Sequence, residues 1–193
     1  MMKKFLALML AMLLALSLVA CGGSDATVGG EAGDGDHAYA PTSALDMLTV
    51  VWDAYGGEKF AAVGGGPEME DKVEDAPAAF DLTDRSLAEV NLVLPASAEV
   101  DEAASLVHMM NANTFTAAAY HATGDTAALA ETLRDAVQGN QWMCGFPDKV
   151  AVAVVGEYVL VVFGGQEQVD TFMGVYGGIF GASTVVYDEA VAA

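Results

Sequence analysis

Two apolar stretches separated by only two residues constrain the fold of this chain more than any other feature. They run from Lys149 to Val155 and from Tyr158 to Phe163, and both are rich in valine. Between them stands Gly156-Glu157, a pair with glycine first, which is typical of a type II′ turn between antiparallel strands. Because both strands are apolar at successive positions, we expect other elements to cover both faces of their sheet.

A second hairpin is predicted earlier in the chain. Thr114 to Ala122 alternates two sets of side chains, as a strand does, and the preceding Asn111-Ala112-Asn113 has the composition of a turn. Val100 to Met110 leaves two alternatives open. Its first apolar residues fit a helix, whereas the β-branched and long apolar residues from Ser105 onward fit a strand. A hairpin across the asparagines requires the strand.

Three segments have the apolar spacing of amphipathic helices. The first begins at the predicted N-cap Ser43 and ends at Gly56-Gly57, and the second begins at Asp125 or Thr126 and ends at Gly139-Asn140. The third covers residues 166–180, although its glycines weaken it.

The glycine-rich segment after the first helix is expected to interrupt secondary structure. Residues 59–63 either continue that helix or form a short second piece, and Gly64-Gly65-Gly66-Pro67 then breaks it. A short strand at 184–187 is expected near the end of the chain. The order of elements predicts the α+β class, with a small antiparallel sheet of two hairpins and helices packed on it.

The first 21 residues indicate export. Lys3 and Lys4 precede an apolar run that is too short for a membrane-spanning helix, as in a secretory signal peptide. The ending Leu18-Val19-Ala20-Cys21 resembles the bacterial lipobox, in which the cysteine is lipidated; the alternative is an ordinary secretory signal. We expect these parts along the chain: a lipoprotein signal peptide at 1–20, lipidated Cys21 and a disordered tether at 21–42, one globular domain at 43–187 and a tail at 188–193.

The charge of the chain excludes one class of partner. Asp and Glu number 27 against 7 Lys and Arg, which gives a formal net charge of −20. Such a charge repels nucleic acid, so no nucleic-acid partner is expected. It favours basic peptides or serves solubility alone, and the scattered positions of the acids favour solubility.

Three side chains are candidates for chemistry. His108 and His121 could face each other across the second hairpin as metal ligands, but a metal site needs a third ligand and no metal-binding spacing is present. Cys144 could be a nucleophile, but its neighbours in the sequence are apolar and no CxxC motif accompanies it. We therefore expect no metal, no other cofactor and no enzymatic activity.

The segment Gln141 to Asp148 is the predicted interaction loop. It connects a helix to a strand of the central hairpin, yet it contains Trp142, Cys144, Phe146 and Pro147, which a solvated loop would avoid. Two interpretations remain open. The loop folds under the sheet and caps the core, or it presents its aromatic side chains as anchors for a partner.

Two segments, Ser105 to Phe115 and Gln141 to Lys149, resemble a family of small lipoproteins from Gram-positive gut bacteria. Some members carry the label bacteriocin transport accessory protein. The resemblance covers Leu45 to Tyr176, and it implies attachment to the outer face of the cytoplasmic membrane and no catalytic residues.

We therefore expect a lipid-anchored extracytoplasmic binding or accessory protein of an envelope complex or a peptide exporter. Its expected partners are the membrane, through the lipid, and an envelope protein or peptide. The alternatives are a cysteine-dependent enzyme that uses Cys144 and a structural surface lipoprotein.

Overall fold

The computed structural model describes residues 39–56, 58–66, 68–143 and 145–192. They belong to one unit of the chain, His37–Ala193, built on an eight-stranded antiparallel sheet. The strand order is β2-β1-β4-β5-β7-β6-β8, and β3 also pairs with β4. The strands are β1 Ala62–Gly65, β2 Lys72–Glu74, β3 Ala78–Ala79, β4 Val100–His108, β5 Phe115–Ala122, β6 Lys149–Val155, β7 Tyr158–Gly164 and β8 Val185–Ala190. The predicted α+β class is confirmed, and the sheet has more strands than the two predicted hairpins supply.

The two predicted hairpins form the middle of this sheet. β6 and β7 pair around Gly156-Glu157, and Gly156 has a φ of 59°, which glycine adopts without strain. The segment from residue 100 to 110, for which a helix remained open, contains the strand β4 and pairs with β5. The connection is a 3-10 turn, Ala112–Thr114, capped by the side chain of Asn111. Because β5 also pairs with β7, the two hairpins are neighbours.

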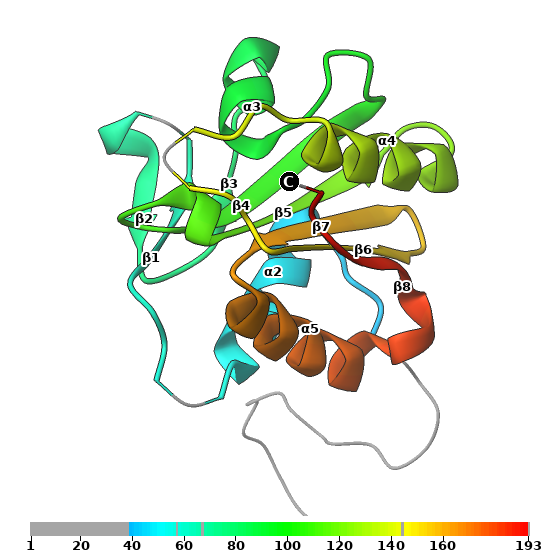
Figure 1. The fold of residues 1–193 in the computed structure, drawn as a ribbon. Helices are drawn as coiled ribbons and strands as arrows, with labels where there is room; N and C mark the ends of the chain where they lie inside the picture. The colour runs from blue at the N-terminus through cyan, green and yellow to red at the C-terminus, as the bar shows by residue number, and fades with distance from the viewer. Residues whose placement is uncertain (1–38, 57, 67, 144, 193) are drawn as a thin grey trace, which may run out of the picture. The chain divides into compact units, whose positions relative to one another are not determined.

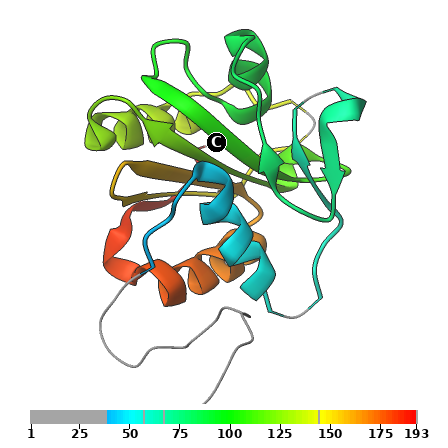
Figure 2. The ribbon, with the colours of Figure 1, turned by 180° about the vertical axis from the view of Figure 1, so that it is seen from behind.

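Two helices cover each face of the sheet (Figures 1 and 2). The helices α2 Ala44–Ala54 and α5 Gln166–Phe180 lie on one face, and α3 Arg85–Leu92 and α4 Thr126–Gln138 lie on the other. The predicted N-caps are confirmed, since the side chains of Ser43 and Asp125 accept hydrogen bonds from the first turns of α2 and α4. The apolar residues on both faces of the central hairpin are thereby buried.

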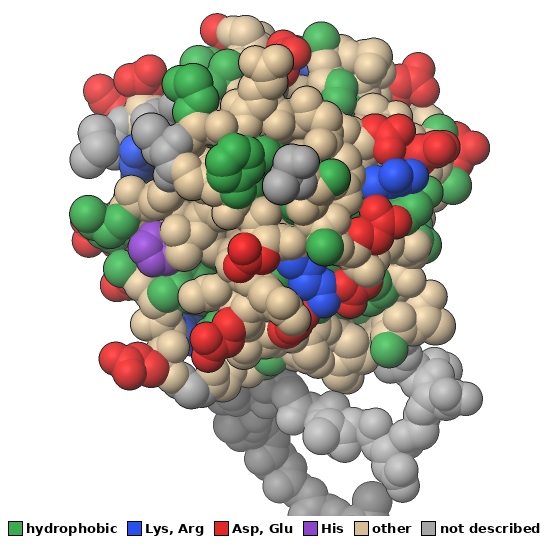
Figure 3. Space-filling model, viewed as in Figure 1, with side chains coloured by type: hydrophobic (Ala, Val, Ile, Leu, Met, Phe, Trp, Pro, Cys, Tyr) green, Lys and Arg blue, Asp and Glu red, His purple; other side chains and the backbone are tan. Residues whose placement is uncertain are grey.

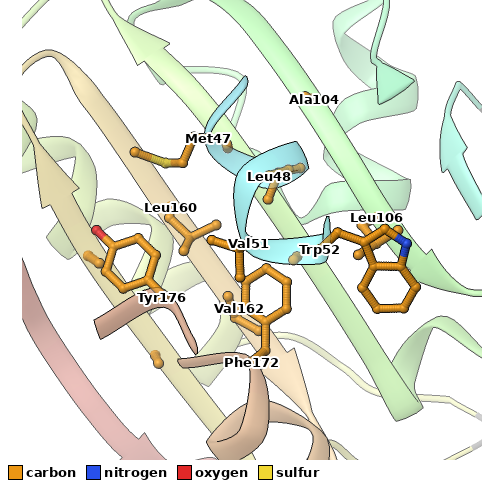
Figure 4. Close-up of a cluster of buried hydrophobic side chains, with 14 of the residues drawn as sticks. Met47, Leu48, Val51, Trp52, Ala104, Leu106, Leu160, Val162, Phe172 and Tyr176 are labelled. Carbon is orange, nitrogen blue, oxygen red and sulfur yellow. The ribbon is translucent and has the colours of Figure 1, made fainter. Parts of the chain in front are cut away.

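Each face of the sheet has its own hydrophobic core. Figure 4 shows the core under α2 and α5, where side chains of these helices meet those of β4 and β7. Its members include Met47, Leu48, Val51, Leu106, Leu160, Val162, Phe172 and Tyr176. In the opposite core, Leu129, Leu133 and Val137 of α4 pack on the sheet. Each such side chain contributes about 1.5–3 kcal/mol when it is fully buried.

The glycine-rich segment forms a strand, so the predicted helical piece at 59–63 and the predicted break are wrong. Residues 62–65 are β1, the second strand of the sheet. A Cβ on Gly64 would collide with the backbone of Ala78, and one on Gly65, whose φ is 95°, would collide with a neighbouring carbonyl. The buried hydroxyl of Ser105 accepts from the N–H of Gly65 and donates to its carbonyl, both at 2.9 Å. Glycine is needed here for close backbone approach.

Both ends of the described chain contact the domain. Tyr39 lies in the segment predicted as tether, and its N–H donates to the carbonyl of Ile179 at 3.3 Å. Its ring lies edge-on to Phe180 at 5.7 Å between centroids, and its hydroxyl donates to Asp46 at 2.9 Å. At the other end, β8 continues to Ala190 through residues predicted as tail, because it pairs with β6 along this length.

Candidate functional site

Three loops gather at the end of the sheet where β4 ends and β5 begins. Their described residues are 55–56 and 58–61, 109–114, and 141–143 and 145–148, and we call this region the loop end. The N–H of Met109 donates to the carbonyl of Ala61 at 2.9 Å and so joins the first two loops. The antiparallel pairing of β1, β4, β5, β7 and β6 brings these segments together although they are far apart in the sequence.

Asn113 joins the second loop to the third. Its Nδ2 donates to the carbonyls of Met143 and Gly145, at 2.9 Å each. The turn after β4 and the loop before β6 therefore contact each other. Since one amide holds two carbonyls of the neighbouring loop, the loop end is fixed by polar contacts as well as by packing.

The predicted interaction loop is divided between core and surface. Trp142 is partly buried, and its ring lies 5.2 Å from that of Phe163 in the core under α4. Its indole Nε1 is buried and has no hydrogen-bond partner in the described part of the chain. Pro147 is buried, whereas Phe146 is 67% exposed. Cys144 lies outside the described residues. The interpretation that the loop caps the core fits Trp142 and Pro147, whereas the interpretation that the loop contacts a partner fits Phe146.

Exposed apolar side chains are concentrated at the loop end. Met109 is 44% exposed, Met110 82%, Met143 78% and Phe146 67%. Figure 3 shows hydrophobic side chains at several places on this face of the molecule, some of them at the left edge, on the side where Figure 1 places β1 and β2. Exposed apolar groups that gather in one place indicate a contact surface, whereas single ones are normal on any protein. Met109 and Met110, which precede the turn, extend the exposed apolar surface beyond the predicted interaction loop.

A cavity of about 210 Å³ opens beside these side chains. The segments that line it are β1, β2, the end of α3, the end of β4 and the turn that follows β4. Its lining residues are Val63, Gly64, Gly65, Gly66, Lys72, Phe80, Asn91, Leu92, Val107, His108, Met109, Met110, Asn111 and Ala112. We call it the glycine-strand cavity, because β1 forms one wall. The sequence did not predict it, since the glycines of β1 were interpreted as a break.

The two histidines lie near opposite ends of the hairpin, so the prediction that they could face each other is wrong. His108 is the last residue of β4, at the loop end, whereas His121 pairs with Glu102 near the other end. The Nδ1 of His108 accepts from the N–H of Met110 at 3.2 Å, and its ring stacks on Phe60. Within the described ranges, no group of three or more His, Cys, Asp or Glu residues could hold a metal ion.

His121 belongs to a separate charged group. Its Nδ1 lies 2.6 Å from Oδ1 of Asp101, and its Nε2 lies 3.8 Å from Oε2 of Glu157. The hydrogen bond to Asp101 raises the pKa of His121, although partial burial opposes the shift. This group stabilises the far end of the hairpin and takes no part in the loop end.

Strained backbone occurs next to the glycine-strand cavity. Among the described residues other than glycine, only Asp75 and Val93 have a positive φ, of 54° and 55°. Val93 directly follows Leu92, which lines the cavity, and Asp75 directly follows β2, which carries Lys72. The left-handed conformation is unfavourable for a β-branched residue, and such strain is often found near binding sites. Nothing in the sequence marks Val93 for this conformation.

No protein-family model, curated protein or solved structure matches the chain. None of the helices in the described residues is long and apolar enough to cross a membrane. The function has therefore to be argued from the loop end itself.

Proposed function

We propose that the chain is a lipid-anchored extracytoplasmic binding protein, an accessory component of an envelope complex or a peptide exporter. The signal peptide and the lipobox-like ending at Cys21 support export and anchoring. The resemblance of residues 105–115 and 141–149 to accessory lipoproteins supports the same role. In this proposal the loop end contacts the partner and no reaction is catalysed.

One observation carries the proposal. Four large apolar side chains, those of Met109, Met110, Met143 and Phe146, are exposed on two loops that Asn113 holds together. Methionine side chains are flexible and polarisable, so they adapt to differently shaped apolar partners. Phenylalanine supplies a rigid anchor of the type that contributes strongly to interfaces.

The charge of the chain defines the kind of partner. With a formal net charge of −20, the protein attracts basic partners over distance and repels acidic ones. Apolar contacts at the loop end would supply affinity, and the surrounding acids would favour a partner with a basic rim. The proposed partner is therefore a peptide or protein that combines apolar side chains with lysine or arginine.

Site-specific photo-crosslinking in intact membranes tests this proposal. A benzophenone amino acid replaces Phe146 in one variant and Val186 in the control variant. Val186 is also apolar and 49% exposed, but it lies on the edge strand β8 beside the middle of β6, outside the loop end. We expect a discrete crosslinked product from position 146 and none from position 186. The same products from both positions, or none from position 146, would contradict the proposal.

A further inference from the structure

The glycine-strand cavity has an apolar floor on the α3 side of the sheet. Along β4, Leu106 belongs to the core under α2 and α5, whereas Val107 packs against the opposite core, which contains Phe80 and Leu92. Val63 pairs with Val107 and therefore lies on the same face, because the two partners of an antiparallel pair share a face of the sheet. All four residues on the α3 side line the cavity. The floor is thus continuous with the core on that side.

The charged groups next to this floor are mostly carboxylates. A carboxyl oxygen of Asp71 lies 3.4 Å from the position that a Cβ on Gly66 would occupy. Glu74 pairs with Val63 in the sheet, so its side chain lies on the same face as the floor. Residues 68–75, which form the turn and the edge strand here, contain five acidic residues and one lysine. The surroundings of the floor therefore favour a cation over an anion.

The cavity borders the exposed apolar side chains of the loop end and is small. Met109 and Met110 line it and belong to the loop end, whereas the ring of His108 stacks on Phe60 on the opposite face of the sheet. An engineered apolar cavity of about 150 Å³ holds one benzene molecule. The volume of about 210 Å³ therefore has room for one side chain of the size of leucine or methionine.

We propose that the glycine-strand cavity receives one large aliphatic side chain of the partner, and that a basic residue beside it in the partner lies near Asp71 and Glu74. The inference rests on the proposed function, since the neighbouring residues of the partner would contact Met109 and Met110. Transfer of the aliphatic side chain from water into the cavity supplies affinity, and the carboxylates select a partner with a basic neighbour. A second copy of the chain is a poor occupant, because two molecules with a formal net charge of −20 repel each other.

Fluorescence anisotropy with the full chain in phosphatidylcholine nanodiscs tests this inference. The probe is a labelled, amidated heptapeptide in which lysines flank a central leucine and the other positions are glycine. One matched peptide has alanine in place of the leucine, and another has glutamates in place of the lysines. We expect the leucine peptide to bind about tenfold or more tightly than the alanine peptide, because alanine buries less apolar surface. The glutamate peptide should not bind, because its charges face carboxylates.

Two pairs of protein variants locate the site. Val63→Phe fills part of the cavity and should weaken binding of the leucine peptide about tenfold, whereas Val154→Phe, at a partly buried valine that lines another cavity, should not. Glu74→Lys and Glu131→Lys change the net charge equally at exposed positions, but only Glu74 lies beside the cavity floor. We expect binding to be about threefold or more weaker in Glu74→Lys than in Glu131→Lys.

Any of four results would overturn the inference: no binding of the leucine peptide, equal binding of it and either matched peptide, full affinity in Val63→Phe, or equal affinity in the two charge variants. The peptide comparison uses the unchanged protein, so it does not depend on the folding of a variant. Hexanoate that displaces the leucine peptide as effectively as unlabelled peptide would assign the cavity to acyl chains instead. If position 146 crosslinks a partner while the leucine and alanine peptides bind alike, the proposed function stands and this inference fails.

Discussion

Replacement of Trp142 by alanine tests which half of the predicted interaction loop belongs to the core. The indole packs on Phe163 and is partly buried. Truncation of a fully buried tryptophan costs about 3–5 kcal/mol, and partial exposure and the removal of an unpaired N–H both lower that cost. We therefore expect Trp142→Ala to lower the free energy of unfolding by about 2–3 kcal/mol. Phe146→Ala is the matched control, with an expected change below about 0.5 kcal/mol.

Urea unfolding of the full chain in detergent, followed by circular dichroism, measures these differences. A third variant, Trp142→Phe, keeps an aromatic ring against Phe163 and removes the unpaired indole N–H, so it should lie close to the wild type. The slopes of the unfolding curves should agree among the variants, because a changed slope indicates a change in the unfolded or native ensemble. If Phe146→Ala costs as much as Trp142→Ala, or if Trp142→Ala costs nothing, the division of the loop is wrong.

Three further predictions concern charge and anchoring. Lys149→Met should lower the free energy of unfolding by roughly 1–2 kcal/mol. The reason is that Lys149 contacts the carboxylates of Asp170 and Asp188 at 2.5 Å each, and its loss removes this cation from both. Unchanged urea unfolding would contradict this prediction. His121→Gln should destabilise the protein most below the ordinary histidine pKa of 6.5, and progressively less as the pH rises through the raised pKa, where the ring loses its proton. A difference in the free energy of unfolding that does not depend on pH would refute the role of Asp101. Cys21→Ala should leave the chain unprocessed or release it into the medium, because the proposed acyl chains anchor the protein with about 0.8 kcal/mol per buried methylene. A variant that cell fractionation finds processed and membrane-bound would exclude the lipid anchor.

The elements that the sequence predicted are those with local signals. Gly156-Glu157 between two apolar runs marks the central hairpin, and Ser43 and Asp125 mark the starts of α2 and α4. The strand β4 needed a second signal, the asparagine turn, because its own residues also fit a helix. In each case the deciding residues lie within a few positions of the element, so the sequence contains the information that fixes it.

The glycine-strand cavity could not be predicted, because non-local contacts create it. Gly64 is required by the backbone of Ala78, a residue fourteen positions away in the chain, and no local pattern shows that approach. The left-handed conformation of Val93 at the end of α3 contradicts the preference of valine, so packing outweighs propensity there. The separation of His108 and His121 follows from strand register, which composition alone does not determine.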